Sequence, residues 1–273
     1  MLIVDSQVHI WGSNLPANTA HRQVTSYTAE DVLKEMDDAG VNAAVIHPPG
    51  WDDGASNMAL EAARQHPNRL SILGKFPLDD PASRSLIDGW KQQTGMLGLR
   101  FTFLQPPQLS WLTDGTADWL WPAAERVGLP IGLAAPGFLP AIGQVAERHP
   151  GLKLTVDHMG RPQRKTDESA FETLPDLIAL AKYPNVAVKA SGAPSYSSQP
   201  YPFENIHDYI HEIYDAFGPE RTFWGTDITR MPCSYRECVT MFTEELPWLS
   251  ENEKELVMGQ ALCRWLGWEV PGG

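Results

Sequence analysis

The sequence predicts one α/β domain over residues 1–273, folded as a (β/α)8 TIM barrel. Eight short, β-branched segments alternate with longer amphipathic ones, and this alternation favours a parallel sheet covered by helices. The length of 273 residues is near the roughly 250 that such a barrel needs. No repeat, charge run or Gly/Ser-rich linker divides the chain into smaller domains.

Each predicted strand is a short apolar run that ends close to a polar or turn-forming residue. The eight runs are residues 2–9, 41–47, 70–76, 97–103, 130–135, 152–158, 186–191 and 222–227. A doubly wound open sheet is the alternative, but the glycine-rich GxGxxG turn expected after its first strand is absent. We therefore favour the closed barrel.

The predicted helices lie between these strands. In the first, Thr28 can cap the amino terminus with Asp31 three residues on, and Gly40 can end the helix. The other helices are predicted over residues 55–66, 82–94, 117–127, 139–149, 170–182, 206–217, 235–246 and 251–266. They complete eight strand–helix units and a final helix.

Composition narrows the classes of partner. Asp and Glu number 34 against 21 Lys and Arg, and a formal charge of −13 repels nucleic acid. No apolar run reaches the roughly 18 residues that span a bilayer, so we expect no membrane. Asp5 stands where a secretory signal needs basic and apolar residues, and three cysteines show no CxxC pair, so we expect a cytoplasmic protein. A small molecule is the expected partner, and a homo-oligomer is compatible with the sequence.

Polar side chains gather at the predicted carboxyl ends of the strands, where barrel enzymes place their active sites. This set comprises Gln7, His9, His47, Lys75, Arg100, His158, Lys189 and Asp227. Histidine can bind a metal or polarise a carbonyl, and a carboxylate can be a general base or a metal ligand. The structural alternative for Asp227 is the N-cap of the following helix. For His9 and His47 it is a histidine that only hydrogen-bonds within the fold.

Basic residues near these ends are candidates for binding a substrate anion. Arg100 has the planar fork that suits a carboxylate, and Arg161 and Arg230 share that chemistry. Lys75 and Lys189 can pair with a carboxylate such as Asp227 or bind substrate themselves. Tyr196 lies in the irregular stretch 191–202, a candidate loop over the site. We expect Asp157 to point outward and anchor a loop.

Several segments resemble the amidohydrolase-related (amidohydrolase 2) family, which includes pyrone-dicarboxylate lactonase, sugar lactonases and the aminocarboxymuconate semialdehyde decarboxylase group. The resemblance lies in segments 5–11 (Asp-Ser-Gln-Val-His-Ile-Trp), 98–101 (Gly-Leu-Arg-Phe), 157–160 (Asp-His-Met-Gly), 188–192 (Val-Lys-Ala-Ser-Gly) and 224–227 (Trp-Gly-Thr-Asp). The resemblance spans nearly the whole chain and implies an amidohydrolase-like barrel, closest to the lactonase branch.

Two departures from the family pattern bear on metal binding. Gln7 stands where the family has a histidine, and an amide is a poorer zinc ligand than imidazole. Ala134 and Ala135 end the fifth strand, where metal-dependent relatives often have a histidine. Only His9, His158 and Asp227 remain of the ligand set that the resemblance implies. We therefore favour no cofactor, and one zinc or manganese ion on these three residues is the alternative.

The resemblance implies hydrolysis of a lactone or related carboxylic substrate. In this hypothesis Asp227 activates a water molecule, while His9 and His158, helped by Gln7, polarise the carbonyl. Gln7, His47, Lys75, Arg100, Arg161, Lys189, Tyr196 and Arg230 are the candidate substrate-binding residues. A metal-dependent decarboxylase or hydratase of an aromatic or unsaturated acid is the alternative. A catalytically inactive, ligand-binding barrel is the third hypothesis.

Overall fold

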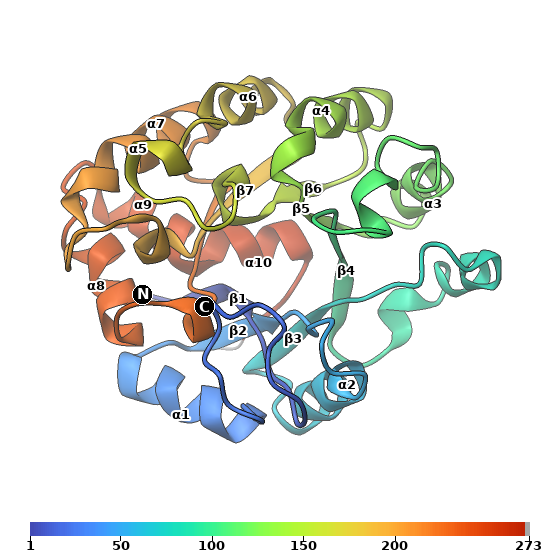
Figure 1. The fold of residues 1–273 in the computed structure, drawn as a ribbon, viewed down its shortest axis with the longest axis horizontal. Coiled ribbons are helices and arrows are strands. Elements are labelled where there is room, and N and C mark those ends of the chain that lie inside the picture. Colours follow the sequence, from blue (N-terminus) through green and yellow to red (C-terminus); the bar gives the residue numbers. More distant parts are fainter. Residues whose placement is uncertain (271–273) are drawn as a thin grey trace.

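The computed structural model describes residues 1–270 and shows the predicted barrel (Figure 1). Eight parallel strands follow one another in chain order around the sheet. They are β1 (Val4–Val8), β2 (Ala43–Ile46), β3 (Leu70–Gly74), β4 (Met96–Thr102), β5 (Ile131–Ala134), β6 (Leu154–Val156), β7 (Val186–Ser191) and β8 (Thr222–Gly225). Their inward side chains and the surrounding helices form the apolar core.

The barrel closes between β8 and β1 mainly through one buried carboxylate. Asp5 accepts hydrogen bonds from the backbone N–H of Thr226 at 2.9 Å, from the Thr226 hydroxyl and from the Tyr235 hydroxyl at 2.6 Å. Just beyond, the Asp227 N–H donates to the carbonyl oxygen of Gln7 at 2.8 Å. The first and last strands are therefore joined directly beneath Asp227.

Gly225 is needed for this closure, and Gly225→Ala is expected to destabilise the fold. A Cβ at this position would collide with Ser6 Oγ and lie 3.0 Å from Asp5 Oδ1. We expect a loss of about 1–3 kcal/mol in the free energy of unfolding, because the two strands must move apart. Urea unfolding measures it, with Gly137→Ala as control, since nothing lies within 4 Å of a Cβ there. Equal stability of the two variants would contradict this interpretation.

The helices surround the sheet (Figure 1). The α-helices are α1 (Ala29–Ala39), α2 (Ala55–Gln65), α3 (Leu120–Arg126), α4 (Leu139–Arg148), α5 (Asp167–Ala170), α6 (Leu174–Ile178), α7 (His207–Phe217), α8 (Tyr235–Thr243), α9 (Glu251–Glu255) and α10 (Ala261–Leu266). The predicted ends of α1 are confirmed: Thr28 and Asp31 form a capping box, and Gly40 ends the helix with φ 78°. None of the helices in residues 1–270 is both long and apolar enough to cross a bilayer.

Three predicted helices are wrong as continuous α-helices. Residues 82–94 form two 3₁₀ turns, Pro81–Leu86 and Trp90–Gln92, with Gly89 between them. Residues 170–182 are split, because Pro175 lacks the N–H of a helix interior and lies instead in the first turn of α6. Residues 251–266 contain a π-helical segment at Leu256–Gln260, in which Gly259 packs closely on the start of β1.

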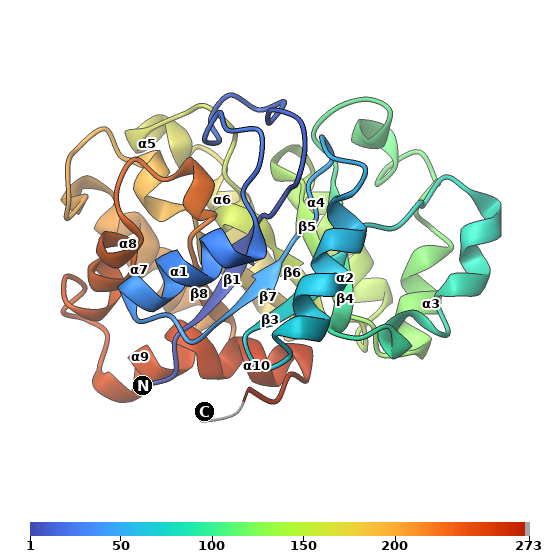
Figure 2. The same ribbon diagram turned by 90° about the horizontal axis from the view of Figure 1, so that it is seen from below.

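Seven of the eight predicted strands end one or two residues too late, and the strand over residues 186–191 is confirmed at both ends. His9, His47, Lys75, His158 and Asp227 lie in the loops just after the strands, whereas Gln7, Arg100 and Lys189 lie within β1, β4 and β7. These loops cover one end of the barrel, whereas α9, α10 and the start of the chain lie at the other (Figure 2). The loop after β1 rises highest above the site and is the long blue segment in that view. The loops thus gather polar side chains at one end of the barrel.

Candidate active site

A cavity of about 680 Å³ opens among these loops, at the carboxyl end of the strands. That volume suits a small ligand. Of the predicted site residues, those lining the cavity are His9, Lys75, Arg100, His158, Arg161, Tyr196, Asp227 and Arg230. Gln7, His47 and Lys189 are buried beneath it and are not among the lining residues.

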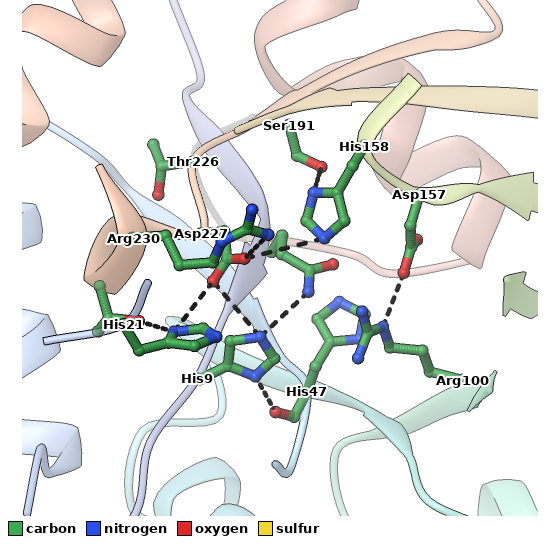
Figure 3. Close-up of polar contacts among 12 residues, drawn as sticks. His9, His21, His47, Arg100, Asp157, His158, Ser191, Thr226, Asp227 and Arg230 are labelled. Atoms are coloured by element: carbon green, nitrogen blue, oxygen red, sulfur yellow. Dashed lines mark hydrogen bonds and ion pairs between the residues drawn. The ribbon is translucent and has the colours of Figure 1, made fainter. Parts of the chain in front are cut away.

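Asp227 lies at the centre of the site (Figure 3). Its Oδ1 is 3.4 Å from His9 Nε2, and its Oδ2 is 3.8 Å from His158 Nε2 and 3.2 Å from Arg230 Nη1. Burial alone would raise the pKa of this carboxyl, but the histidines and Arg230 hold it well below its usual value. Asp227 is therefore an ionised carboxylate, and Oδ1 has no hydrogen-bond donor among the described residues.

The tautomer of His9 follows from its partners. Nδ1 is 2.6 Å from the carbonyl oxygen of His47, which can only accept, so Nδ1 carries the proton. Burial lowers the pKa of His9, so the ring is neutral and Nε2 presents a lone pair. The Gln7 amide can donate to that lone pair at 3.3 Å. Contrary to our prediction, neutral His9 has no proton on Nε2 with which to polarise a carbonyl; this atom can accept a proton or bind a metal.

His21 is the site residue that the sequence analysis missed. It lies in the long loop between β1 and α1, where no motif singles it out. Its Nδ1 is 2.8 Å from Thr229 Oγ1 and 4.0 Å from Asp227 Oδ1. The centroids of the His21 and His9 rings are 5.4 Å apart, in an edge-on arrangement. The hydrogen bond from Arg22 N–H to the Thr229 carbonyl, at 2.7 Å, fixes this loop beside the one that carries Asp227.

His9, His21 and Asp227 form a group whose ligand atoms all lie within 4.8 Å of one another. Tetrahedral zinc with bonds of about 2.0–2.2 Å separates its ligands by roughly 3.3 Å, and His9 Nε2 and Asp227 Oδ1 are 3.4 Å apart. Two acceptor atoms facing each other at this distance suit a cation. The group fits a divalent ion and weakens the expectation of a metal-free site. It also replaces His158 with His21 in the predicted ligand set.

His158 faces Asp227 from the opposite side (Figure 3). It follows β6 with φ 52°, and Asp227 follows β8 with φ 55°. Such left-handed backbone is unfavourable for residues other than glycine and is concentrated at functional sites. The Ser191 hydroxyl lies 2.9 Å from His158 Nδ1 and orients the ring, leaving Nε2 directed toward Asp227.

The expectation that Asp157 points outward is wrong. Its carboxylate is buried and accepts from Arg100 Nε at 2.7 Å and pairs with Lys189 Nζ at 2.9 Å. Lys189 also contacts Gln7 Oε1 at 3.0 Å and His47 Nε2 at 3.1 Å. Burial opposes ionisation, but the cations Lys189 and Arg100 keep the pKa of Asp157 far below its usual value. Lys189, His47 and Gln7 therefore form a support under the cavity floor.

The remaining predicted residues lie around the cavity. Lys75 is exposed, whereas Arg161 and Tyr196 are buried and line the wall. Arg100 lines the cavity, and its Nε is bound to Asp157. Arg230 binds Asp227 directly. Within residues 1–270, Arg161 Nη2 and Arg230 Nε have no hydrogen-bond partner, whereas Lys189 and Arg100 are paired with Asp157.

Stability should fall as the pH drops, because several site histidines are buried in neutral form. Burial lowers the pKa of His21 from 6.5 to about 3 and that of His158 to about 4, although Asp227 opposes this. Between its folded-state pKa and 6.5, each histidine binds more protons in the unfolded chain than in the folded one. The contribution of these rings to stability is therefore fully present above pH 6.5 and is lost as the pH falls below it. Each group contributes roughly 1.4 kcal/mol per pH unit. Burial also raises the pKa of Asp5 to about 6, a contribution of opposite sign.

The measurement is urea unfolding, with chelator present, from about pH 7.5 to about pH 4.5. We expect the free energy of unfolding to fall across this range, and His21→Asn to reduce the slope. Unchanged stability over this range in the parent protein would contradict neutral burial of these rings.

Comparison with known proteins is consistent with this geometry. The family model for amidohydrolases matches residues 4–262. An L-fucono-1,5-lactonase from Burkholderia ambifaria is 30% identical over 230 residues, covering 82% of this chain and 79% of that protein.

Two solved structures share the fold over nearly the full length. An amidohydrolase from Burkholderia multivorans with bound zinc has a TM-score of 0.84 at 20% identity, covering 98% of this chain and 99% of that one. A putative 2-pyrone-4,6-dicarboxylic acid hydrolase from Pseudomonas putida has a TM-score of 0.76 at 21% identity, covering 98% of each chain. With the match over residues 4–262, the chain belongs to the amidohydrolase family.

Proposed function

We propose that this hydrolase opens a lactone by attack of water on the ring carbonyl. The observation that carries the proposal is the ionised Asp227, whose Oδ1 has no donor among the described residues and faces the cavity beside the His9 lone pair. The carboxylate can receive the proton of a water bound at this position, and the neutral imidazole beside it keeps its lone pair for a metal ion. The related L-fucono-1,5-lactonase supports the lactone as the substrate class.

Each remaining group of the site has a role in this reaction. With Ser191 donating to Nδ1, His158 presents its Nε2–H to the carbonyl oxygen and stabilises the oxyanion that develops there. Arg230 holds Asp227 ionised and in place. When the ring opens, the product carries a new carboxylate, and the Arg100 guanidinium, which lines the cavity, can bind it.

The chain also provides side chains that can bind a metal ion. We infer that His9, His21 and Asp227 hold one divalent ion. When bound, such an ion supplies Lewis acidity and lowers the pKa of a coordinated water. The hydrogen bond from His9 Nδ1 to the His47 carbonyl fixes the ring with Nε2 toward Asp227, so that both side chains would be in position to hold the ion.

Elemental analysis of the purified protein tests this ligand assignment. We expect one zinc or manganese ion per chain, and loss of the ion in His21→Ala with no loss in His66→Ala, which changes a histidine outside the site. A lower unfolding temperature after chelation is the second expected result. Metal-free protein that neither binds zinc nor gains stability from it would contradict the assignment.

A panel of five- and six-membered lactones, assayed for acid release with and without chelator, tests the reaction. We expect at least one to be hydrolysed with kcat/KM of about 10⁴ M⁻¹ s⁻¹ or more. The fit of the His9–His21–Asp227 group to a metal also favours the alternative, metal-assisted decarboxylation. Release of CO₂ from aromatic acids, with no lactone hydrolysed, would favour that alternative. Ligand binding without turnover of either class would indicate an inactive barrel.

A further inference from the structure

We propose that Cys233 and Cys238 form a redox-active thiol pair, which hydrogen peroxide converts into an intramolecular disulfide. The two sulfur atoms are 3.5 Å apart, close enough for one thiol to donate a hydrogen bond to the other. Both are free thiols, as is Cys263. The pair lies at the junction between the loop after β8 and α8, and neither residue lines the cavity. This inference is therefore independent of the proposed lactone hydrolysis.

The start of α8 brings the two thiols together. Ser234 is the N-cap of this helix and forms a capping box with Glu237. Cys233 is the residue before the cap and Cys238 is the fourth residue of the helix, two positions whose side chains often pack on each other at helix starts. Apolar side chains at these positions only pack. Two thiols in the same contact can also be oxidised to a bond.

The helix side of the pair is fixed to the barrel. The Tyr235 hydroxyl donates to Asp5 at 2.6 Å, and Trp224 Nε1 donates to the Cys238 carbonyl at 3.1 Å. Cys233 precedes the helix, in irregular backbone. A disulfide bond is about 2.05 Å long, so the sulfur atoms must approach by about 1.5 Å, and we expect Cys233 to make this movement.

This movement would act on the loop that carries the centre of the site. Asp227 and Arg230 lie on the short segment that leads from β8 to Cys233. The Arg230 N–H donates to the Asp227 carbonyl at 2.8 Å, and its side chain binds the Asp227 carboxylate. The disulfide would therefore tie the segment that carries both residues to α8.

Exposure and acidity indicate which thiol reacts first. Cys233 is partly exposed, whereas Cys238 is buried. The hydrogen bond with Cys233, together with burial, raises the pKa of the Cys238 thiol well above its usual value. Because the thiolate is the form that peroxide oxidises, oxidation begins at Cys233.

The reaction balances with hydrogen peroxide as the oxidant. The Cys233 sulfur attacks one peroxide oxygen, the O–O bond breaks, and the products are a sulfenic acid and one water. The Cys238 sulfur then attacks the Cys233 sulfur, and the displaced hydroxide leaves with the Cys238 proton as a second water. The two thiols together lose two electrons, which reduce the peroxide. A dithiol such as dithiothreitol reverses the change.

Thiol counting tests the proposal. The folded protein is treated with excess hydrogen peroxide, freed of peroxide, unfolded in urea and titrated for thiols. We expect three thiols before treatment, one after it, and three again after reduction with dithiothreitol. The thiol that remains should be Cys263, because burial raises its pKa to about 11.

Trypsin cuts after Arg236, between the two cysteines, so a digest without reductant locates the bond. We expect residues 231–236 and 237–254 to appear as one product, lighter by two hydrogen atoms than the two peptides together. Cys233→Ser and Cys238→Ser should each abolish this product. Cys263→Ser is the matched control and should keep it.

Four results would overturn the thiol pair. They are three thiols remaining in the folded protein after peroxide, oxidation of Cys233 to sulfinic acid with no linked peptides, a disulfide that joins Cys263, and a disulfide between two chains, seen as a dimer on a gel without reductant. None of these measurements uses a substrate, so they are decided separately from the lactone assay.

Discussion

Asp227→Asn is expected to lower kcat for lactone hydrolysis by about 10²- to 10⁴-fold while the protein stays folded. The amide has almost the same shape but cannot take a proton from water and is a poor metal ligand. It also loses the charge that pairs with Arg230 Nη1 at 3.2 Å. The measurement is kcat at saturating lactone, together with a circular dichroism spectrum.

Metal content separates the two roles of Asp227. If the carboxylate acts only as a ligand, excess zinc should restore activity to Asp227→Asn; if it is the base, a variant with full metal occupancy stays inactive. Asp215→Asn, an exposed change on α7, is the matched control and should keep the parental kcat. Retention of more than about a tenth of kcat by Asp227→Asn would exclude the proposed role.

Asp157→Asn is expected to cause the largest loss of stability of any single substitution considered. It leaves Lys189 and Arg100 buried without their shared carboxylate, which lies 2.9 and 2.7 Å from them. Removing one partner of a buried ion pair costs about 3–5 kcal/mol. Urea unfolding at neutral pH, where Asp157 is ionised and its pKa is far below the usual value, measures this loss.

A double variant separates charge pairing from packing. Asp157→Asn with Lys189→Met removes one carboxylate and one cation, so it should be less destabilised than the sum of the two single variants. A loss below about 1 kcal/mol in Asp157→Asn would show that the ion pairs contribute little. Additive losses would show that the two residues act independently.

The order of strands and helices could be predicted because it depends on local patterns. Apolar runs, the Thr28 cap and the Gly40 stop are properties of neighbouring residues, and the structure confirms them. The failures depend on contacts that are distant in sequence. Gly259, for example, lies in the π-helical segment of the final helix, where a Cβ would meet the Leu2 carbonyl at 2.8 Å, a contact with the opposite end of the chain.

The site could be predicted only in part, for the same reason. His9, His158 and Asp227 follow strands, so the barrel topology brings them together. His21 reaches Asp227 from the long loop after β1, whose path is set by the contact of Arg22 with Thr229. The direction of Asp157 depends on Lys189 and Arg100, which lie on other strands. The tautomer of His9 depends on a carbonyl 38 residues away.

Hydrolysis in ¹⁸O-labelled water is the most direct test of the central claim, attack of water on the lactone carbonyl. For a lactone turned over by the protein, we predict a product that has gained one labelled water, with the label in the new carboxylate and none in the hydroxyl. Mass spectrometry of the product and its fragments shows this. Label in the hydroxyl, or loss of CO₂ without incorporation of label, would contradict the proposed reaction.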